Sequence, residues 1–370
     1  MTEQLTNSTT GQIVDLLQRK EISSRGVTQL RRALVRPRQT LPRSSYRGMS
    51  PPAGRMAADG PARVRQEQGR SVMAGELFTI TPLGPFSLAE AATFGFGQRE
   101  GGGWDGVMRM AFCLDGYTGH AGVELRQDDD GTVRGMAQVG GTAEESGGLD
   151  AVVRQVARLL SLDHDATGFV RVGERDPVIG RLQAAAPGLR PPLFYSPYEA
   201  AAWAVLSARR PARQMQLVRQ RLSETHGEVF ELAGERLAAF PSPRQLLSVS
   251  SFPGIPADKL ARLHGVADAA FAGRLDVDHL KALGPERAMA ELQQINGIGP
   301  FYSALVVIRG TGFTDVLPIH EPEALALTAQ LYQLAAPPGP EEFARIAETW
   351  RPFRTWAVVL IRAAAGRLQD

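Results

Sequence analysis

Four short stretches between residues 76 and 140 alternate apolar and polar positions, and Gly and Asp residues separate them. They are ELFTITPLGPF (76–86), VMRMAFCLD (107–115), GHAGVELRQ (119–127) and TVRGMAQVG (132–140). A period of two is typical of half-buried β-strands. LDAVVRQVARLLSL (149–162) instead places its apolar residues at helical spacing. The pattern therefore predicts a small N-terminal α+β domain with an antiparallel sheet over residues 73–165.

From about residue 190 the apolar spacing is helical throughout. Ser196-Pro197-Tyr198-Glu199 has the signals of a helix start, with Ser as the N-cap and Pro in the first helical position. Roughly nine helical segments with short connections describe a compact helical region. The fold class is therefore predicted to be mainly α, with an all-α region over residues 166–370.

Residues 1–72 have a different composition, because they hold 13 of the 41 Lys/Arg and only 5 of the 39 Asp/Glu. Residues 35–72 are rich in Arg, Pro, Gly and Ser and lack apolar periodicity. Such a segment buries too little apolar surface to offset the entropy of ordering. We therefore predict a disordered basic extension, which is either an inert tail or an arm that binds nucleic acid non-specifically.

The remaining residues carry 28 Lys/Arg and 34 Asp/Glu, a net charge of −6. A polyanionic partner must therefore meet a local basic patch. No apolar run reaches the roughly 18 residues of a membrane span, and the N-terminus lacks the order of a secretory signal. The single cysteine, Cys113, excludes an intramolecular disulfide and a Cys-rich metal site. We expect a cytoplasmic protein with no membrane partner and no catalytic metal.

The stretch NGIGPFYSALVVIRG (296–310) places two glycines before a long apolar helix. Gly permits positive φ and close backbone approach, Ile298 can plug the space between two helices, and Pro300 suits a first helical turn. A plain helix connection is the simpler interpretation of Asn296, Gly297, Ile298 and Gly299. The alternative is a hairpin whose backbone N–H groups bind phosphate.

Three further segments flank this hairpin in the sequence. SARRP (207–211) precedes it, and DVLPIHE (315–321) and WRPFRTWA (350–357) follow it. Together with LQQINGIGPFYSA (292–304), these motifs resemble the helix-hairpin-helix DNA glycosylase superfamily. They look most like its 3-methyladenine DNA glycosylase II branch, which acts in alkylation repair. The resemblance is strong over residues 190–370 and weak over 76–165.

The resemblance implies specific catalytic roles. Glu321 stands where the family has its catalytic Asp, and Asp315, whose family counterpart is usually structural, is the alternative acid. A carboxylate beside the sugar stabilises the oxocarbenium-like transition state of N-glycosidic cleavage or orients water. Superfamily members that also cut the DNA backbone use a Lys just after the hairpin. Phe301 occupies that position here and cannot form an imine, so the resemblance implies a monofunctional enzyme.

The resemblance also implies a pocket for a base flipped out of the duplex. Candidate lining residues are aromatic, and core packing is the alternative for each of them: Phe301, Tyr302, Trp203 and Trp350. Such rings favour positively charged alkylated bases through cation–π attraction. Arg209 and Arg210 lie where the family contacts DNA and inserts a wedge, and Ala208 replaces the family's common Gln.

The motifs therefore imply a monomeric, bacterial-type, nucleoid-associated base excision repair enzyme. Its partner is double-stranded DNA containing alkylated bases, and it hydrolyses the N-glycosidic bond of alkylated purines. No cofactor is expected, and the resemblance implies a structural monovalent cation held by the hairpin carbonyls, as in relatives. The alternative is a non-catalytic helix-hairpin-helix DNA-binding protein that has lost base excision.

Overall fold

The computed structural model describes residues 75–94, 104–140 and 148–368. These residues all lie within one compact unit of the chain. The extension predicted over residues 1–72 lies outside the described residues. The boundary predicted between residues 165 and 166 stays a prediction.

A four-stranded antiparallel sheet forms where the sequence alternates. Its strands are β1 (Glu76–Ile80), β2 (Met108–Cys113), β3 (His120–Gln127) and β4 (Val133–Gly140), in the order β1-β4-β3-β2. Helices α4 (Leu88–Phe94) and α6 (Gly148–Leu159) supply apolar residues to the core of the sheet. The predicted antiparallel sheet is confirmed.

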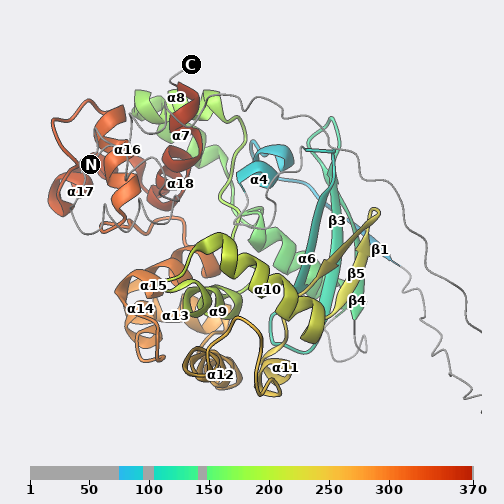
Figure 1. Cartoon of the computed structure of the whole chain (residues 1–370). Coiled ribbons are helices and arrows are strands. Elements are labelled where there is room, and N and C mark those ends of the chain that lie inside the picture. Colours follow the sequence, from blue (N-terminus) through green and yellow to red (C-terminus); the bar gives the residue numbers. More distant parts are fainter. Residues whose placement is uncertain (1–74, 95–103, 141–147, 369–370) are drawn as a thin grey trace, which may run out of the picture. The chain divides into compact units, whose positions relative to one another are not determined.

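A second, two-stranded sheet corrects the prediction that only helices follow residue 190. Strands β5 (Val229–Leu232) and β6 (Glu235–Ala238) form a hairpin, and β5 lies along β3 (Figure 1). Its turn is Ala233-Gly234, and both residues have positive φ, as the favoured two-residue hairpin turns require. Phe230 packs closely over Gly122 of β3. A Cβ at Gly122 would lie 2.4 Å from the Phe230 ring. The hairpin is therefore stabilised by the sheet it covers.

One group of helices surrounds α9, whose side chains are nearly all buried. This group comprises α9 (Pro197–Ser207), α10 (Ala212–His226), α11 (Pro243–Leu247), α12 (Ala257–Phe271), α13 (Val277–Leu283), α14 (Pro285–Leu292) and α15 (Pro300–Val306). The predicted start of α9 is confirmed, since the Ser196 side chain accepts a hydrogen bond from the Glu199 backbone N–H. Glu199 itself turns inward and pairs with Arg219 of α10 at 2.6 Å.

A second group of helices has its own core, which contains Trp350 and Trp356. It comprises α7 (Thr167–Arg175), α8 (Pro177–Ala185), α16 (Pro322–Leu331), α17 (Pro340–Ile346) and α18 (Arg354–Ala364), with 3-10 turns at Ala347–Trp350 and Ala365–Leu368. Figure 1 shows α16, α17 and α18 beside α7 and α8, with α9 to α15 gathered separately. The helical region therefore has two separate hydrophobic cores.

The chain passes from the first group to the second through a π-helix, Val307–Thr311, that continues α15. Gly312 ends it in the left-handed conformation. Arg309 within it is buried and donates to the Pro192 carbonyl, while the Phe194 N–H donates to the Arg309 carbonyl. Burial lowers the pKa of the Arg309 guanidinium well below its usual range. These contacts hold the end of α15 against the segment that leads into α9.

Asp176 joins the N-terminus of α8 to the rest of the second group. Its Oδ1 accepts from the backbone N–H groups of Val178 and Ile179, as an N-cap does. Its Oδ2 accepts from Tyr332 at 2.7 Å and from the Trp350 indole N–H at 2.9 Å. Since buried donors without an acceptor are costly, this one carboxylate stabilises three separate elements.

We expect Asp176→Ala to lower the free energy of unfolding by about 3 kcal/mol, because it removes the cap and the acceptor of the Tyr332 hydroxyl, and leaves the Trp350 indole N–H only its longer contact with the Tyr332 oxygen at 3.2 Å. Asp276→Ala is the matched control. Asp276 caps α13 through Asp278 and His279 but is exposed, so its loss should cost only about 1 kcal/mol. Urea denaturation of both variants measures the difference. Equal losses would show that the buried hydrogen bonds of Asp176 contribute nothing.

Candidate functional site

The predicted hairpin connects α14 to α15. Ile298 is buried in the first helical core, as its position between two glycines predicts. Gly297 has a φ of +99°, where other residues are strained, and a Cβ at Gly299 would meet open space. Asn296 and Gly297 are exposed at the tip. The hairpin therefore presents backbone rather than side chains to its surroundings.

The hairpin lies beside the end of α9 and the first turns of α12. A Cβ at Gly297 would lie 3.3 Å from the Arg262 side chain and 3.5 Å from Val205. Arg209 and Arg210, both exposed, directly follow α9. The structure thus brings the predicted wedge loop and the hairpin to the same part of the first helical group. Arg262, which the sequence did not single out, packs against the hairpin at Gly297.

The four candidate pocket aromatics separate into two groups. Phe301 is 55% exposed, and its ring meets Tyr302 edge-on with centroids 5.3 Å apart. Tyr302 and Trp203 are half-buried against the first core. Trp350 has no exposed surface, lies in the second core and donates its indole N–H to Asp176. Trp350 is therefore a packing residue, which corrects its assignment to a base pocket, while Phe301, Tyr302 and Trp203 remain candidates.

Glu321 is the N-cap of α16. Its Oε2 accepts a hydrogen bond from the Ala324 backbone N–H at 2.6 Å, and its Oε1 lies 3.6 Å from a guanidinium nitrogen of Arg362. A negative charge is stabilising at a helix N-terminus, so both contacts suit a carboxylate. The side chain keeps 18% exposure. Glu321 is thus oriented by the protein on one side and accessible on the other.

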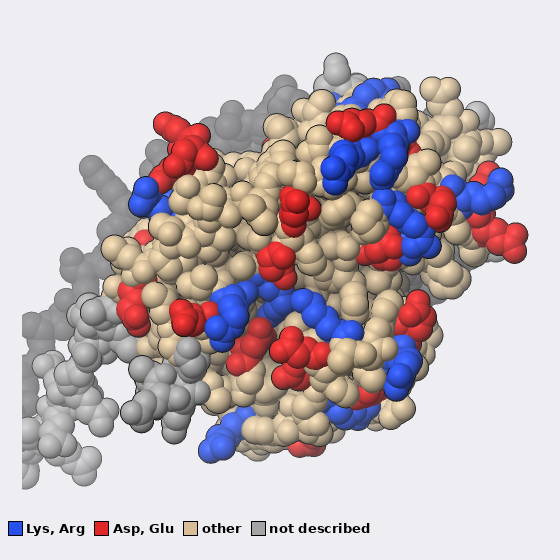
Figure 2. Space-filling model, turned by 180° about the vertical axis from the view of Figure 1, so that it is seen from behind, with Lys and Arg blue, Asp and Glu red and all other residues tan. Residues whose placement is uncertain are grey.

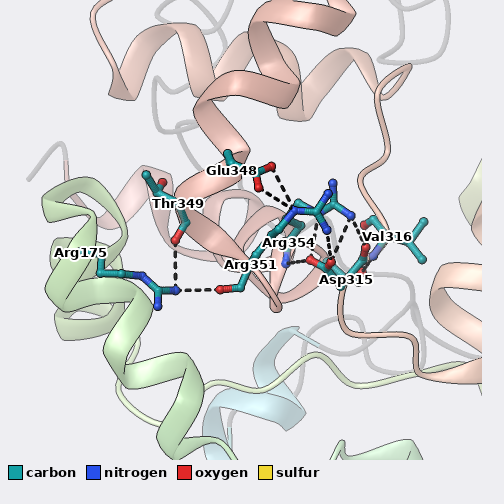
Figure 3. Close-up of polar contacts among 8 residues, drawn as sticks. Arg175, Asp315, Val316, Glu348, Thr349, Arg351 and Arg354 are labelled. Atoms are coloured by element: carbon teal, nitrogen blue, oxygen red, sulfur yellow. Dashed lines mark hydrogen bonds and ion pairs between the residues drawn. The ribbon is translucent and has the colours of Figure 1, made fainter.

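Asp315, the alternative acid, is bound within an ion-pair network (Figure 3). Its Oδ1 accepts from Arg354 Nε at 2.8 Å, and its Oδ2 accepts from Arg351 Nη1 at 2.7 Å. Arg351 also pairs with Glu348, and the hydrogen bond to that carboxylate is the main cause that raises the pKa of Arg351. A carboxylate engaged by two guanidinium groups has little capacity left for substrate. The geometry therefore favours a structural role for Asp315.

The segment WRPFRTWA contacts the connection between α15 and α16 through its threonine. Thr355 donates its backbone N–H to the Thr314 carbonyl, and its Oγ1 both accepts from the Val316 N–H and donates to the Val316 carbonyl. Together with Arg354 it ties residues 314–316 to the start of α18. The motif is recognisable in the sequence, but its bracing of residues 314–316 appears only in the structure.

Charge of both signs is mixed on one face of the molecule. Figure 2 shows Lys and Arg side chains interspersed with Asp and Glu on one face of the molecule. None of the helices in the described part of the chain combines the length and hydropathy needed to cross a bilayer. Within those same ranges, no three His, Cys, Asp or Glu side chains gather closely enough to hold a metal ion.

No known family model matches the chain. It is 29% identical over 203 residues to a Mycobacterium tuberculosis protein named as a probable bifunctional transcriptional activator/DNA repair enzyme AlkA, covering 54% of this chain and 40% of that protein. It is 28% identical over 196 residues to DNA-3-methyladenine glycosylase 2 of Escherichia coli, covering 52% and 66%. The chain therefore spans less than two thirds of the length of these relatives.

Among solved structures, the 3-methyladenine DNA-glycosylase from Archaeoglobus fulgidus aligns with a TM-score of 0.63 at 20% identity, over 77% of this chain and 96% of that one. This level of identity shows a shared fold. The predicted resemblance to the 3-methyladenine branch of the helix-hairpin-helix DNA glycosylases is confirmed.

We expect Asp315→Asn to lower the free energy of unfolding by about 1 to 2 kcal/mol, because Arg354, only 17% exposed, loses its charged partner. Glu348→Gln is the matched control, since it breaks the exposed half of the same network and should change stability by less than about 0.5 kcal/mol. Thermal and urea unfolding of both variants measure this. An equal effect of the two would show that Asp315 does not brace the connection.

Proposed function

We propose that this protein is a monofunctional DNA glycosylase that excises alkylated purines of the 3-methyladenine type in base excision repair. The observation that carries the proposal is the accessible carboxylate of Glu321, fixed at the head of α16 in a chain with the helix-hairpin-helix glycosylase fold. The curated relatives, which are named as DNA repair enzymes and 3-methyladenine glycosylases, support it.

Double-stranded DNA binds through its backbone. The hairpin offers N–H groups at a point where Gly297 and Gly299 leave room for close approach, so a phosphate needs no basic side chain there. Arg209 and Arg210 add positive charge next to it. Local contacts of this kind overcome the net charge of −6 over residues 73–370.

A base inside a duplex is unreachable, so the target nucleotide is rotated out of the stack. Phe301 offers its exposed ring to the displaced base, with Tyr302 edge-on against it, and Trp203 is half-buried against the same helical core. A positively charged alkylated purine is attracted to such rings. The enzyme therefore selects damaged bases partly by their charge.

Cleavage breaks the bond between the sugar C1′ and the purine nitrogen. The bonding electrons leave with the base, and an alkylated cationic purine departs as a neutral molecule without prior protonation. The Glu321 carboxylate stabilises the positive charge that develops on the sugar and orients the water that attacks C1′. The water proton passes to this carboxylate or to solvent, leaving free base and an abasic site.

We expect Glu321→Gln to lower release of methylated purines at least about 100-fold, because it removes the charge facing the sugar. The amide oxygen of Gln can still accept from Ala324, so α16 should keep its cap. The measurement is chromatography of bases released from methylated duplex DNA. Asp315→Asn, at a temperature where it remains folded, is the control and should retain activity within a few-fold of wild type.

The outcomes of this experiment separate the candidate functions. Wild-type protein that binds the duplex but releases no base above background would establish the alternative, a non-catalytic DNA-binding protein. Unchanged release by Glu321→Gln, together with loss in Asp315→Asn, would move the catalytic role to Asp315.

We expect the wild-type enzyme to leave abasic sites uncut, because Phe301 cannot form the Schiff base on which backbone cleavage depends. After excision, the labelled strand should break only upon alkaline treatment. Borohydride added during the reaction should trap no covalent protein–DNA adduct. A trapped adduct would show that another amine acts as nucleophile and that the enzyme is bifunctional.

A further inference from the structure

The loop between α9 and α10 has an unfavourable backbone conformation. Arg209 has a φ of 56°, a left-handed value that residues other than Gly and Asn adopt rarely and at a cost of about 1 kcal/mol. Its neighbours are tightly held, since the Arg210 N–H donates to the Ser207 carbonyl at 3.1 Å. Pro211 then starts α10 directly. Something outside the loop must therefore compensate for its shape.

Lys259 of α12 supplies that compensation. Its ammonium donates to the Leu206 carbonyl at 2.7 Å and to the Ala208 carbonyl at 3.1 Å. Both carbonyls lie at the C-terminus of α9, where intrahelical donors run out and a positive charge is favourable. The side chain is only 8% exposed. Lys259 thus binds Leu206 in the last turn of α9 and Ala208, the residue directly before Arg209.

A lysine is an expensive choice for this position. Burial lowers the pKa of Lys259, and the nearby charges of Arg210 and Arg262 lower it further. A buried cation beside two other cations is retained at a cost in folding free energy. The cost is understandable if the loop shape matters for binding an anion rather than for stability alone.

The same face of α12 also reaches the hairpin. Arg262 follows Lys259 by three residues, so the two side chains are neighbours on the helix surface. The Arg262 stem packs along Gly297, as the 3.3 Å approach to its Cβ position shows. One helix therefore braces both elements that the proposed function places on DNA.

We propose that Lys259 is a positioning residue that holds the 208–211 loop so that Arg209 enters the duplex beside the strand gripped by the hairpin. The inference rests on the proposed function, because it assumes that both elements contact DNA. Lys259 itself does not touch the nucleotide. It acts through the carbonyl groups of Leu206 and Ala208.

The test is a double-mutant cycle between Lys259→Met and Arg209→Ala. Two readouts are used. One is release of methylated purines from duplex DNA. The other is fluorescence of 2-aminopurine placed opposite an abasic-site analogue, which reports insertion of a side chain into the duplex without any chemistry.

Each single variant should lower both signals about tenfold or more, since misplacing a contact by about 1 Å can have that effect. The double variant should fall no further than Arg209→Ala alone, because Lys259 acts through that loop. Lys259→Arg, which keeps charged donors, should restore part of the signal. Lys281→Met is the control. Lys281 is half-buried, and its ammonium lies 4.0 Å from Asp163, which is a long distance for an ion pair, so this substitution should leave both signals unchanged.

Independent, multiplicative losses in the double variant would overturn the proposal, as would wild-type signals in Lys259→Met. Lys259→Gln, which retains an N–H₂ donor, replaces Lys259→Met if the latter does not fold. If wild-type protein releases no base, the proposed catalytic function fails, but the fluorescence cycle still decides whether Lys259 positions Arg209 on DNA.

Discussion

The connection from α15 to α16 crosses from one helical core to the other, and it must be held in place for the rest of the site to form. The hairpin and α15, which carries Phe301, precede this connection, Asp315 lies within it, and Glu321 lies at its end. The ion pairs of Asp315 with Arg354, and the hydrogen bonds of Thr355 to residues 314 and 316, fix its middle. Without this bracing, the carboxylate of Glu321 would have no defined relation to the hairpin.

Electrostatics in this chain are local. Residues 73–370 carry more acidic than basic side chains, and the face seen in Figure 2 mixes both signs. Affinity for a polyanion must then come from backbone N–H groups and from a few arginines around the end of α9. Lys259 and Arg262 add positive charge from a different helix, the first beside the end of α9 and the second beside the hairpin.

The chain shares its fold with glycosylases to which it is only about one-fifth to one-third identical, so packing has been preserved while individual site residues differ. The family resemblance implies an Asp at the position of Glu321 and, in members that cut the backbone, a lysine at the position of Phe301. Glu321 caps α16 with one oxygen, so under the proposed function its extra methylene sets how far the other oxygen extends. The chemistry proposed for the site depends on that reach.

Local signals were predictable from the sequence. The strands of the first sheet, the Ser196 cap, the hairpin with its buried Ile298 and the structural character of Asp315 all follow from short-range pattern or from motif resemblance. Each of these depends on residues within a few positions of one another, or on a motif whose members appear in order along the chain.

Tertiary structure decided the rest. The β5–β6 hairpin is held where Phe230 packs over Gly122. The indole N–H of the buried Trp350 donates a hydrogen bond to Asp176, which lies 174 residues earlier in the chain. Lys259 reaches carbonyl groups more than 50 residues earlier in the chain. No periodicity encodes such pairings, since the free energy of a buried hydrogen bond or ring contact depends on which partner the completed fold brings within reach.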